Sequence, residues 1–133
     1  IATQLACALP HTKTLHLPNG ILLAVLDMDK YIHTFTFPPA GKSVGEVHDH
    51  IRAAHEEEPV ITIGHARDFA VIRSRGVHMD FPAIVSELST QLEGAGISGG
   101  GHLVVGSMRF IQGMRKEVLK ALVERFGRIE MEG

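Results

Sequence analysis

The chain has 133 residues and a net charge of -2, a length that fits one domain and lets folding bury roughly two thirds of the unfolded chain's surface. Apolar residues make up 44% and charged residues 21%, which excludes a disordered, collagen-like or coiled-coil chain. A single cysteine excludes an internal disulfide. Because the net charge is slightly negative, any polyanion has to be held by a local group of donors.

Location and domain organisation follow from the same composition. The longest apolar run, Ile21 to Leu26, is far shorter than the roughly twenty residues that cross a bilayer, and no signal-peptide pattern is present. We therefore expect a cytoplasmic protein without membrane contact. The sequence begins at Ile1 without an initiator methionine, so we expect residues 1–20 to be a lead-in segment from an upstream region and residues 21–133 to be the folded domain.

The pattern in the first half of the domain predicts four strands and one helix. Two β-type runs, residues 21–28 and 31–37, are expected to pair as a hairpin. Ser43 and Glu46 have capping-box spacing and predict a helix from about residue 44 to 54. Two short β-branched runs, at residues 59–64 and 69–74, predict the third and fourth strands.

The second half alternates helices with one more strand. Asp80 can cap a helix that opens near Pro82 and stops at Gly94. A glycine-dense loop, a strand over residues 102–110 and a helix over residues 114–126 follow. This order predicts a single α/β domain with a mixed five-stranded sheet and helices packed against it.

The most informative segment is Ser98-Gly99-Gly100-Gly101-His102. Adjacent glycines weaken folding through backbone entropy unless the backbone takes positive φ or approaches a ligand closely. Successive amide N–H groups in such a loop can point at one anion, and His102 can add a donor or a cation. The segment is predicted to be a phosphate-binding loop, and the alternative is a flexible connection between a helix and a strand.

A second candidate is Arg73-Ser74-Arg75, which follows a buried run and so places two guanidinium groups and a hydroxyl at a strand end. Arginine suits bidentate recognition of phosphate. The alternative is a solvated turn between a strand and a helix.

Two further motifs are set aside. Ala40-Gly41-Lys42-Ser43 lacks the upstream glycine of a nucleotide P-loop, because Thr36 stands in its place. His48-Asp49-His50 looks like a metal motif, but helix residues two positions apart point to different faces, so a solvated helix face is expected. The other histidines lack ligand spacing.

The glycine segment also carries a resemblance to a known family. Gly99-Gly100-Gly101-His102, with Gly106 four positions on, resembles the GGGH signature of the DHHA1 domain, the C-terminal substrate-binding half of DHH phosphoesterases. Residues 37–43, 61–64 and 69–74 and the final helix fall in the family's order, so the resemblance covers about residues 21–126. Residues 104–107 with Gly113-Met114-Arg115 are more similar to archaeal RecJ-like proteins.

The resemblance implies a binding role without catalytic residues in this chain. In that role the phosphate would be gripped by Gly99, Gly100, Gly101 and His102, and Arg73 with Ser74 would contact phosphate or sugar, with Arg75 and Gly106 secondary. Such contacts position a substrate without reading bases. The chain itself is expected to bind no cofactor, because Mn²⁺ or Mg²⁺ would be held by a separate N-terminal DHH domain and activate a water there.

The same resemblance names expected partners. They are a phosphate-bearing substrate such as single-stranded nucleic acid or a short oligonucleotide, the N-terminal DHH domain of the same protein, and GINS-type replication proteins. The fragment is not expected to be active alone. Two alternatives stay open: a non-catalytic scaffold module of a replication or repair assembly, and the substrate domain of a phosphatase for dinucleotides, bisphosphate nucleotides or polyphosphate.

Overall fold

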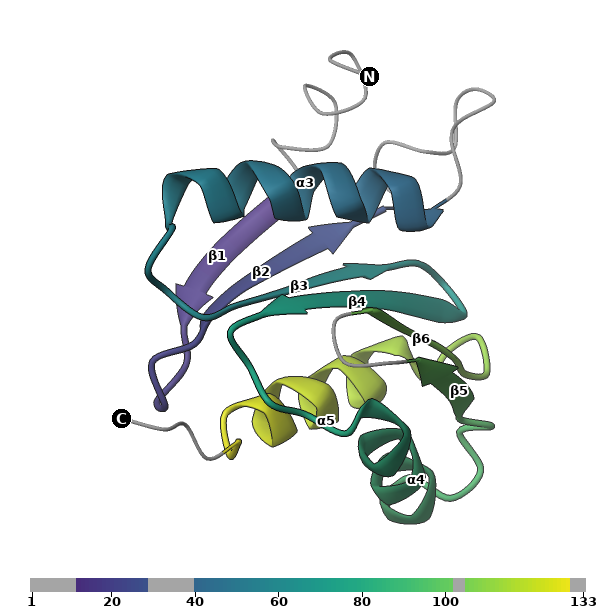
Figure 1. The fold of residues 1–133 in the computed structure, drawn as a ribbon. Coiled ribbons are helices and arrows are strands. Elements are labelled where there is room, and N and C mark those ends of the chain that lie inside the picture. Colours follow the sequence, from purple (N-terminus) through teal and green to yellow (C-terminus); the bar gives the residue numbers. More distant parts are fainter. Residues whose placement is uncertain (1–11, 29–39, 102–104, 130–133) are drawn as a thin grey trace.

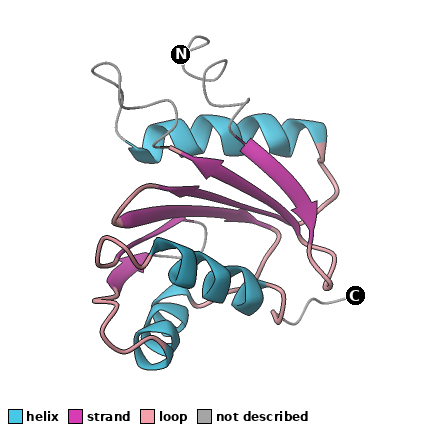
Figure 2. Ribbon diagram, turned by 180° about the vertical axis from the view of Figure 1, so that it is seen from behind, coloured by secondary structure: helices cyan, strands magenta, loops and turns pink. Residues whose placement is uncertain are grey.

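The described residues form three layers. The computed structural model describes residues 12–28, 40–101 and 105–129 (Figure 1). One sheet lies between helix α3 (Ala40–Ala54) on one face and helices α4 (Phe81–Gln91) and α5 (Arg115–Phe126) on the other. Figure 2 shows the same layers from behind. The predicted α/β class, with helices packed against a mixed sheet, is confirmed.

The sheet has six strands in the order β1-β2-β3-β4-β6-β5. Strands β2 and β3 run parallel, with α3 between them in the chain, and the other neighbours pair antiparallel. A parallel pair needs a crossover connection of this kind. The strands are β1 (Thr12–His16), β2 (Leu22–Asp27), β3 (Val60–His65), β4 (Phe69–Arg75), β5 (Ser98–Gly101) and β6 (Val105–Arg109).

The predicted strand count of five is therefore wrong: the two edge strands were not predicted, and one predicted strand, residues 31–37, lies outside the described residues. Strand β1 falls inside residues 1–20, which the sequence placed in a lead-in segment, and it pairs along β2. Strand β5 falls inside the predicted glycine loop. A strand whose side chains are exposed on both faces of the sheet needs no alternating apolar pattern, and β1 is exposed along most of its length.

The predicted hairpin between residues 21–28 and 31–37 is also wrong. Residues Leu22 to Leu26 of β2 pair with β1 on one side and with β3 on the other. Both hydrogen-bonding edges of this strand are therefore occupied. The expected partner, residues 31–37, lies outside the described residues.

The helix termini agree in part with the prediction. Asp80 is the N-cap of α4, and its Oδ1 accepts a hydrogen bond from the Ala83 amide at 3.1 Å, as expected. Helix α3 begins at Ala40, so Ser43 lies inside the helix and the predicted cap at Ser43 is wrong. No helix among the described residues is both long and apolar enough to cross a bilayer.

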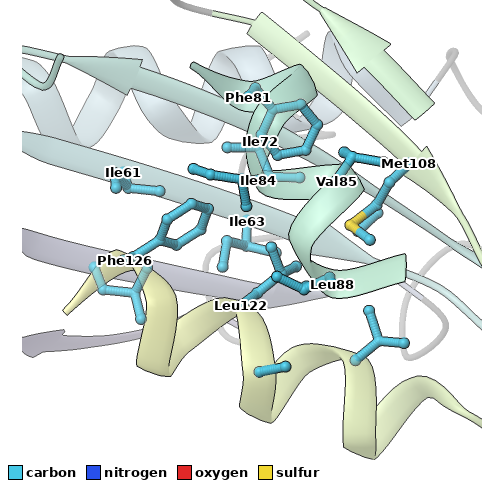
Figure 3. Packing of buried hydrophobic residues seen from close by; sticks show 14 of the residues in the cluster. Ile61, Ile63, Ile72, Phe81, Ile84, Val85, Leu88, Met108, Leu122 and Phe126 are labelled. Atoms are coloured by element: carbon cyan, nitrogen blue, oxygen red, sulfur yellow. The ribbon is translucent and has the colours of Figure 1, made fainter. Parts of the chain in front are cut away.

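Two apolar cores lie on the two faces of the sheet. The larger one joins β-strand side chains such as Ile61 and Ile72 to Phe81 of α4 and Phe126 of α5 (Figure 3). The smaller one lies under α3 and includes Val44 and Leu26. Because a buried side chain of this size contributes about 1.5–3 kcal/mol, the two cores hold both helical layers against a rigid sheet.

Candidate functional site

The sheet register brings the two predicted anion-binding segments together. Val105 of β6 lies opposite Arg73 of β4, and Gly106 lies opposite Gly101 of β5. The connection between β5 and β6 therefore starts and ends beside Arg73. His102, in that connection, lies outside the described residues. We call residues 73–75 together with the β5–β6 hairpin (residues 98–109) the β4–hairpin edge.

The described glycines of the hairpin serve close packing. A Cβ atom on Gly106 would lie 2.5 Å from Cδ2 of the Phe81 ring, and one on Gly99 would collide with the Ser107 carbonyl oxygen. Neither Gly99 nor Gly106 has positive φ. At these two positions the backbone closely approaches other residues of the same chain. The sequence analysis had allowed for a close approach to a ligand instead.

The glycine segment is a strand where the prediction had a loop. Ser98 to Gly101 pair antiparallel with β6 over four residues. In a strand, successive N–H groups point alternately to the paired neighbour and to the open edge. Successive amides of Gly99, Gly100 and Gly101 therefore do not converge on one anion as they would in a loop.

Arg73 is the charged side chain of the β4–hairpin edge that lies under α3. Its guanidinium packs on the helix backbone, since a Cβ atom on Gly45 would lie 3.0 Å from Arg73 Cζ. Its strand neighbour is Thr62 of β3, and its side chain is half-buried. The glycine at position 45 thus makes room for an arginine between the helix and the sheet.

Ser74 and Arg75 have other surroundings. Ser74 points to the opposite face of the sheet from Arg73, because side chains alternate along a strand, and it is buried. Arg75 Nη2 donates to the carbonyl oxygens of His55 and Glu58, both at 2.6 Å. Arg75 therefore holds the loop after α3 in place, and Arg73 and Ser74 face different sides.

His48 is a buried polar residue that the sequence analysis missed. The expectation of a solvated face is wrong for His48, which is 3% exposed, and holds for Asp49 and His50, which are exposed. His48 Nδ1 shares a hydrogen bond of 2.7 Å with the Thr62 hydroxyl. The signal was present in the sequence, because position 48 lies on the helix stripe of Val44, Val47 and Ile51.

The electrostatics around His48 keep its ring neutral. The pKa of His48 is lowered from 6.5 to about 4, mainly by burial and also by the positive charges of Arg52, Arg73 and Arg75, while Asp49 opposes them. The ring therefore carries no charge at neutral pH. It joins α3 to β3 through one hydrogen bond without adding a cation beside Arg73.

Two further polar groups lie at the two ends of β2 and β3, and the second of them adjoins Arg75. At the ends of β2 and β3, Asp27 pairs with Arg115 at 3.8 Å and neighbours the buried His65. At the opposite ends, Glu58 accepts hydrogen bonds from His16 at 2.7 Å and His55 at 2.6 Å, and these bonds lower the pKa of the Glu58 carboxyl. Within the described ranges, no group of three His, Cys, Asp or Glu side chains is arranged to hold a metal ion.

Comparison with known proteins gives matches of high similarity among both curated proteins and solved structures. The chain is 38% identical over 130 residues to the uncharacterized protein MJ1198 of Methanocaldococcus jannaschii, covering 93% of this chain and 17% of that protein. A solved chain described as a member of a family of ribosomal proteins, PF0399 DHH domain, has a TM-score of 0.90 and 36% identity. That match covers 97% of this chain and 30% of the solved one. No family model matches.

The similarity supports a DHH-family module. It extends over nearly the whole chain, at a sequence identity well above what a shared fold alone requires. The chain spans less than a third of the length of either relative. The coarse expectation of a DHH-type α/β domain is therefore supported by a solved structure whose name carries that domain.

Proposed function

We propose that this chain is the DHHA1-type substrate-binding domain of a RecJ-like DHH phosphoesterase, which holds single-stranded nucleic acid or a short oligonucleotide for cleavage. The observation that carries the proposal is the match of 97% of the chain to a DHH-domain structure at 36% identity. In this proposal the Mn²⁺ or Mg²⁺ ions and the activated water belong to a separate catalytic domain. The longer relatives leave room for such a domain.

The surroundings of Arg73 support the β4–hairpin edge as the surface where the substrate phosphate would bind. Arg73 lies beside the ends of the β5–β6 connection, and that connection begins with His102, the last residue of the segment that the resemblance implies for phosphate binding. Packing of its guanidinium on Gly45 orders the side chain, so binding costs less side-chain entropy. Arg75 is committed to two backbone carbonyls and Ser74 is buried on the other face. Because Arg73 is the arginine of this segment that lies beside the β5–β6 connection, we assign it to phosphate.

The name of the solved relative favours nucleic acid over small molecules as the substrate class. That protein is described as a member of a ribosomal-protein family with a DHH domain. A protein that grips phosphates without reading bases binds with a strong dependence on salt. We therefore expect binding of both single-stranded DNA and RNA, with affinity that falls as salt rises.

The test is binding of a fluorescently labelled twelve-nucleotide DNA and its RNA counterpart across a salt series. Arg73→Gln removes the charge and keeps most of the side-chain volume, and we expect it to weaken binding at least about tenfold, the scale of a hydrogen bond to a charged group. Arg67→Gln is the matched control, because Arg67 is exposed in the turn at the other end of β4. The control should bind within about twofold of the native chain.

The outcomes separate the proposal from its alternatives. Equal affinity of Arg73→Gln and the native chain would remove Arg73 from the site. Binding that does not change with salt, or no binding by any variant at the lowest salt, would contradict the substrate-binding role and favour the scaffold hypothesis. Binding of a dinucleotide but not of the longer strands would favour the small-molecule phosphatases. Melting temperatures of the variants serve as the check on folding.

A further inference from the structure

A second site lies on the face of the sheet opposite α3. A pocket of about 560 Å³ opens between the first turns of α4 and the end of α5. Its volume falls in the range of pockets that bind small ligands. It is lined by His78, Met79, Asp80, Ala83, Ile84, Glu87, Arg125, Arg128 and Ile129.

The floor of this pocket is apolar and rigid. Ile84 is 1% exposed and Ile129 is 7% exposed, and both belong to the larger core. Met79 is partly buried and packs against the same cluster. An apolar body lying on this floor would be removed from water without any movement of the core.

One wall holds an arginine that is already oriented. Arg125 Nε lies 2.6 Å from Glu87 Oε2, which ties α5 to α4. That hydrogen bond lowers the pKa of the Glu87 carboxyl, with a contribution from the charge of Arg128. Glu87 is thus ionised and directed to the Nε side of the guanidinium. This hydrogen bond fixes the planar guanidinium of Arg125 and leaves its Nη groups available to a ligand.

The remaining polar groups of the pocket favour an anion. The Asp80 carboxylate accepts the Ala83 amide as the cap of α4. No carboxylate of the described residues is within ion-pair distance of Arg128 or His78. Both acids that line the pocket therefore have partners, while the Arg128 guanidinium, the His78 ring and the Nη groups of Arg125 remain as donors. Arginines in this arrangement suit bidentate binding of a phosphate or carboxylate.

We infer that this pocket binds a small organic anion, with its apolar body on the floor formed by Met79, Ile84 and Ile129 and its phosphate or carboxylate against Arg125 and Arg128. The inference does not depend on the proposed function, since it uses another face of the sheet. The ligand must have both an apolar body and an anionic group, because the apolar floor alone or the two arginines alone would not distinguish it from other molecules.

The experiment is a titration of the ¹⁵N-labelled 133-residue chain followed by amide chemical shifts. Phenyl phosphate and phenylacetate are the probes with both parts, inorganic phosphate has the anion alone, and phenol has the ring alone. We expect shifts at His78, Ala83 and Arg128 with a two-part probe, and binding of the single-part probes at least tenfold weaker. The ratio of the two affinities then tells which anion the arginines prefer.

Matched variants complete the test. Arg128→Gln should weaken binding of the better probe about tenfold without unfolding the chain, because Arg128 is exposed. Arg109→Gln, an exposed arginine on β6, should leave affinity unchanged. Equal binding by the native chain and Arg128→Gln, or shifts confined to other parts of the chain, would overturn the inference. Binding of phenol as tight as that of phenyl phosphate would overturn it as well.

Discussion

Acid should destabilise this fold through one buried histidine. His48 joins α3 to Thr62 of β3 through its Nδ1 atom at 2.7 Å and is 3% exposed. Burial, and then the charge of Arg52, lower its pKa from 6.5 to about 4. The folded protein therefore disfavours the protonated ring, whereas the unfolded chain takes up a proton below about pH 6.5.

The sign and size of the effect follow from this difference in proton uptake. A group whose folded pKa is depressed contributes its full stability above the unfolded pKa and loses it as the pH falls toward the folded pKa. For pKa values of 6.5 and about 4, the loss in unfolding free energy is about 1.4 kcal/mol at pH 5.5 and about 2.5 kcal/mol at pH 4.5. Well below pH 4 the loss levels off at about 3.4 kcal/mol, because His48 is then protonated in both the folded and the unfolded chain.

The assay is urea unfolding followed by circular dichroism at pH 7.5, 6.5, 5.5 and 4.5. His48→Asn places an amide where Nδ1 stands and removes the titrating group. Between pH 7.5 and 4.5 the variant should therefore lose about 2.5 kcal/mol less unfolding free energy than the native protein does. His50→Asn, on the exposed side of the same helix, is the control and should keep the native pH dependence. If His48→Asn and the native protein lose stability in parallel as the pH falls, the argument from burial is refuted.

Three further substitutions test the β4–hairpin edge by unfolding and binding. Arg75→Gln loses two hydrogen bonds to backbone carbonyls, so urea unfolding should show a loss of about 1.5–3 kcal/mol with oligonucleotide affinity little changed; a large loss of affinity would return Arg75 to the site. Gly106→Ala puts a methyl group against the Phe81 ring and should cost about 1–3 kcal/mol, whereas the exposed neighbour Ser107→Ala should cost less than about 0.5 kcal/mol; equal costs would contradict the packing argument. His102→Ala should weaken oligonucleotide binding at an unchanged melting temperature, and a large fall in that temperature would instead give His102 a role in the fold.

The elements that could be predicted from the sequence are those specified by local residues. The cap at Asp80 and the stripe of Ile84 and Leu88 lie within two turns of each other, and α4 begins where they indicate. The runs at residues 59–64 and 69–74 are short, mostly apolar and rich in β-branched residues, and they became the largely buried strands β3 and β4. In these segments the side chains that determine the element are also those that it buries.

The parts that were missed depend on contacts between distant segments. Strand β5 has glycines at three of its four positions, which carry no side-chain pattern, so only pairing with β6 marks it as a strand. The hydrogen bond of His48 depends on Thr62, and the space for Arg73 depends on Gly45. The sheet register brings the two candidate segments side by side, yet the sequence could not tell which of Arg73 and Ser74 faces α3, because the position of that helix depends on the whole fold.

The sheet also separates the two binding proposals. Arg73 lies on the face covered by α3, whereas Arg125 and Arg128 lie on the face covered by α4 and α5. Between them stands a layer of buried strand residues such as Ile61 and Ile72, and interiors packed in this way resist small deformation. Substitutions that are far apart and share no partner have additive effects. Loss of oligonucleotide binding in Arg73→Gln and loss of phenyl phosphate binding in Arg128→Gln are therefore independent results, and a failure of either proposal leaves the other standing.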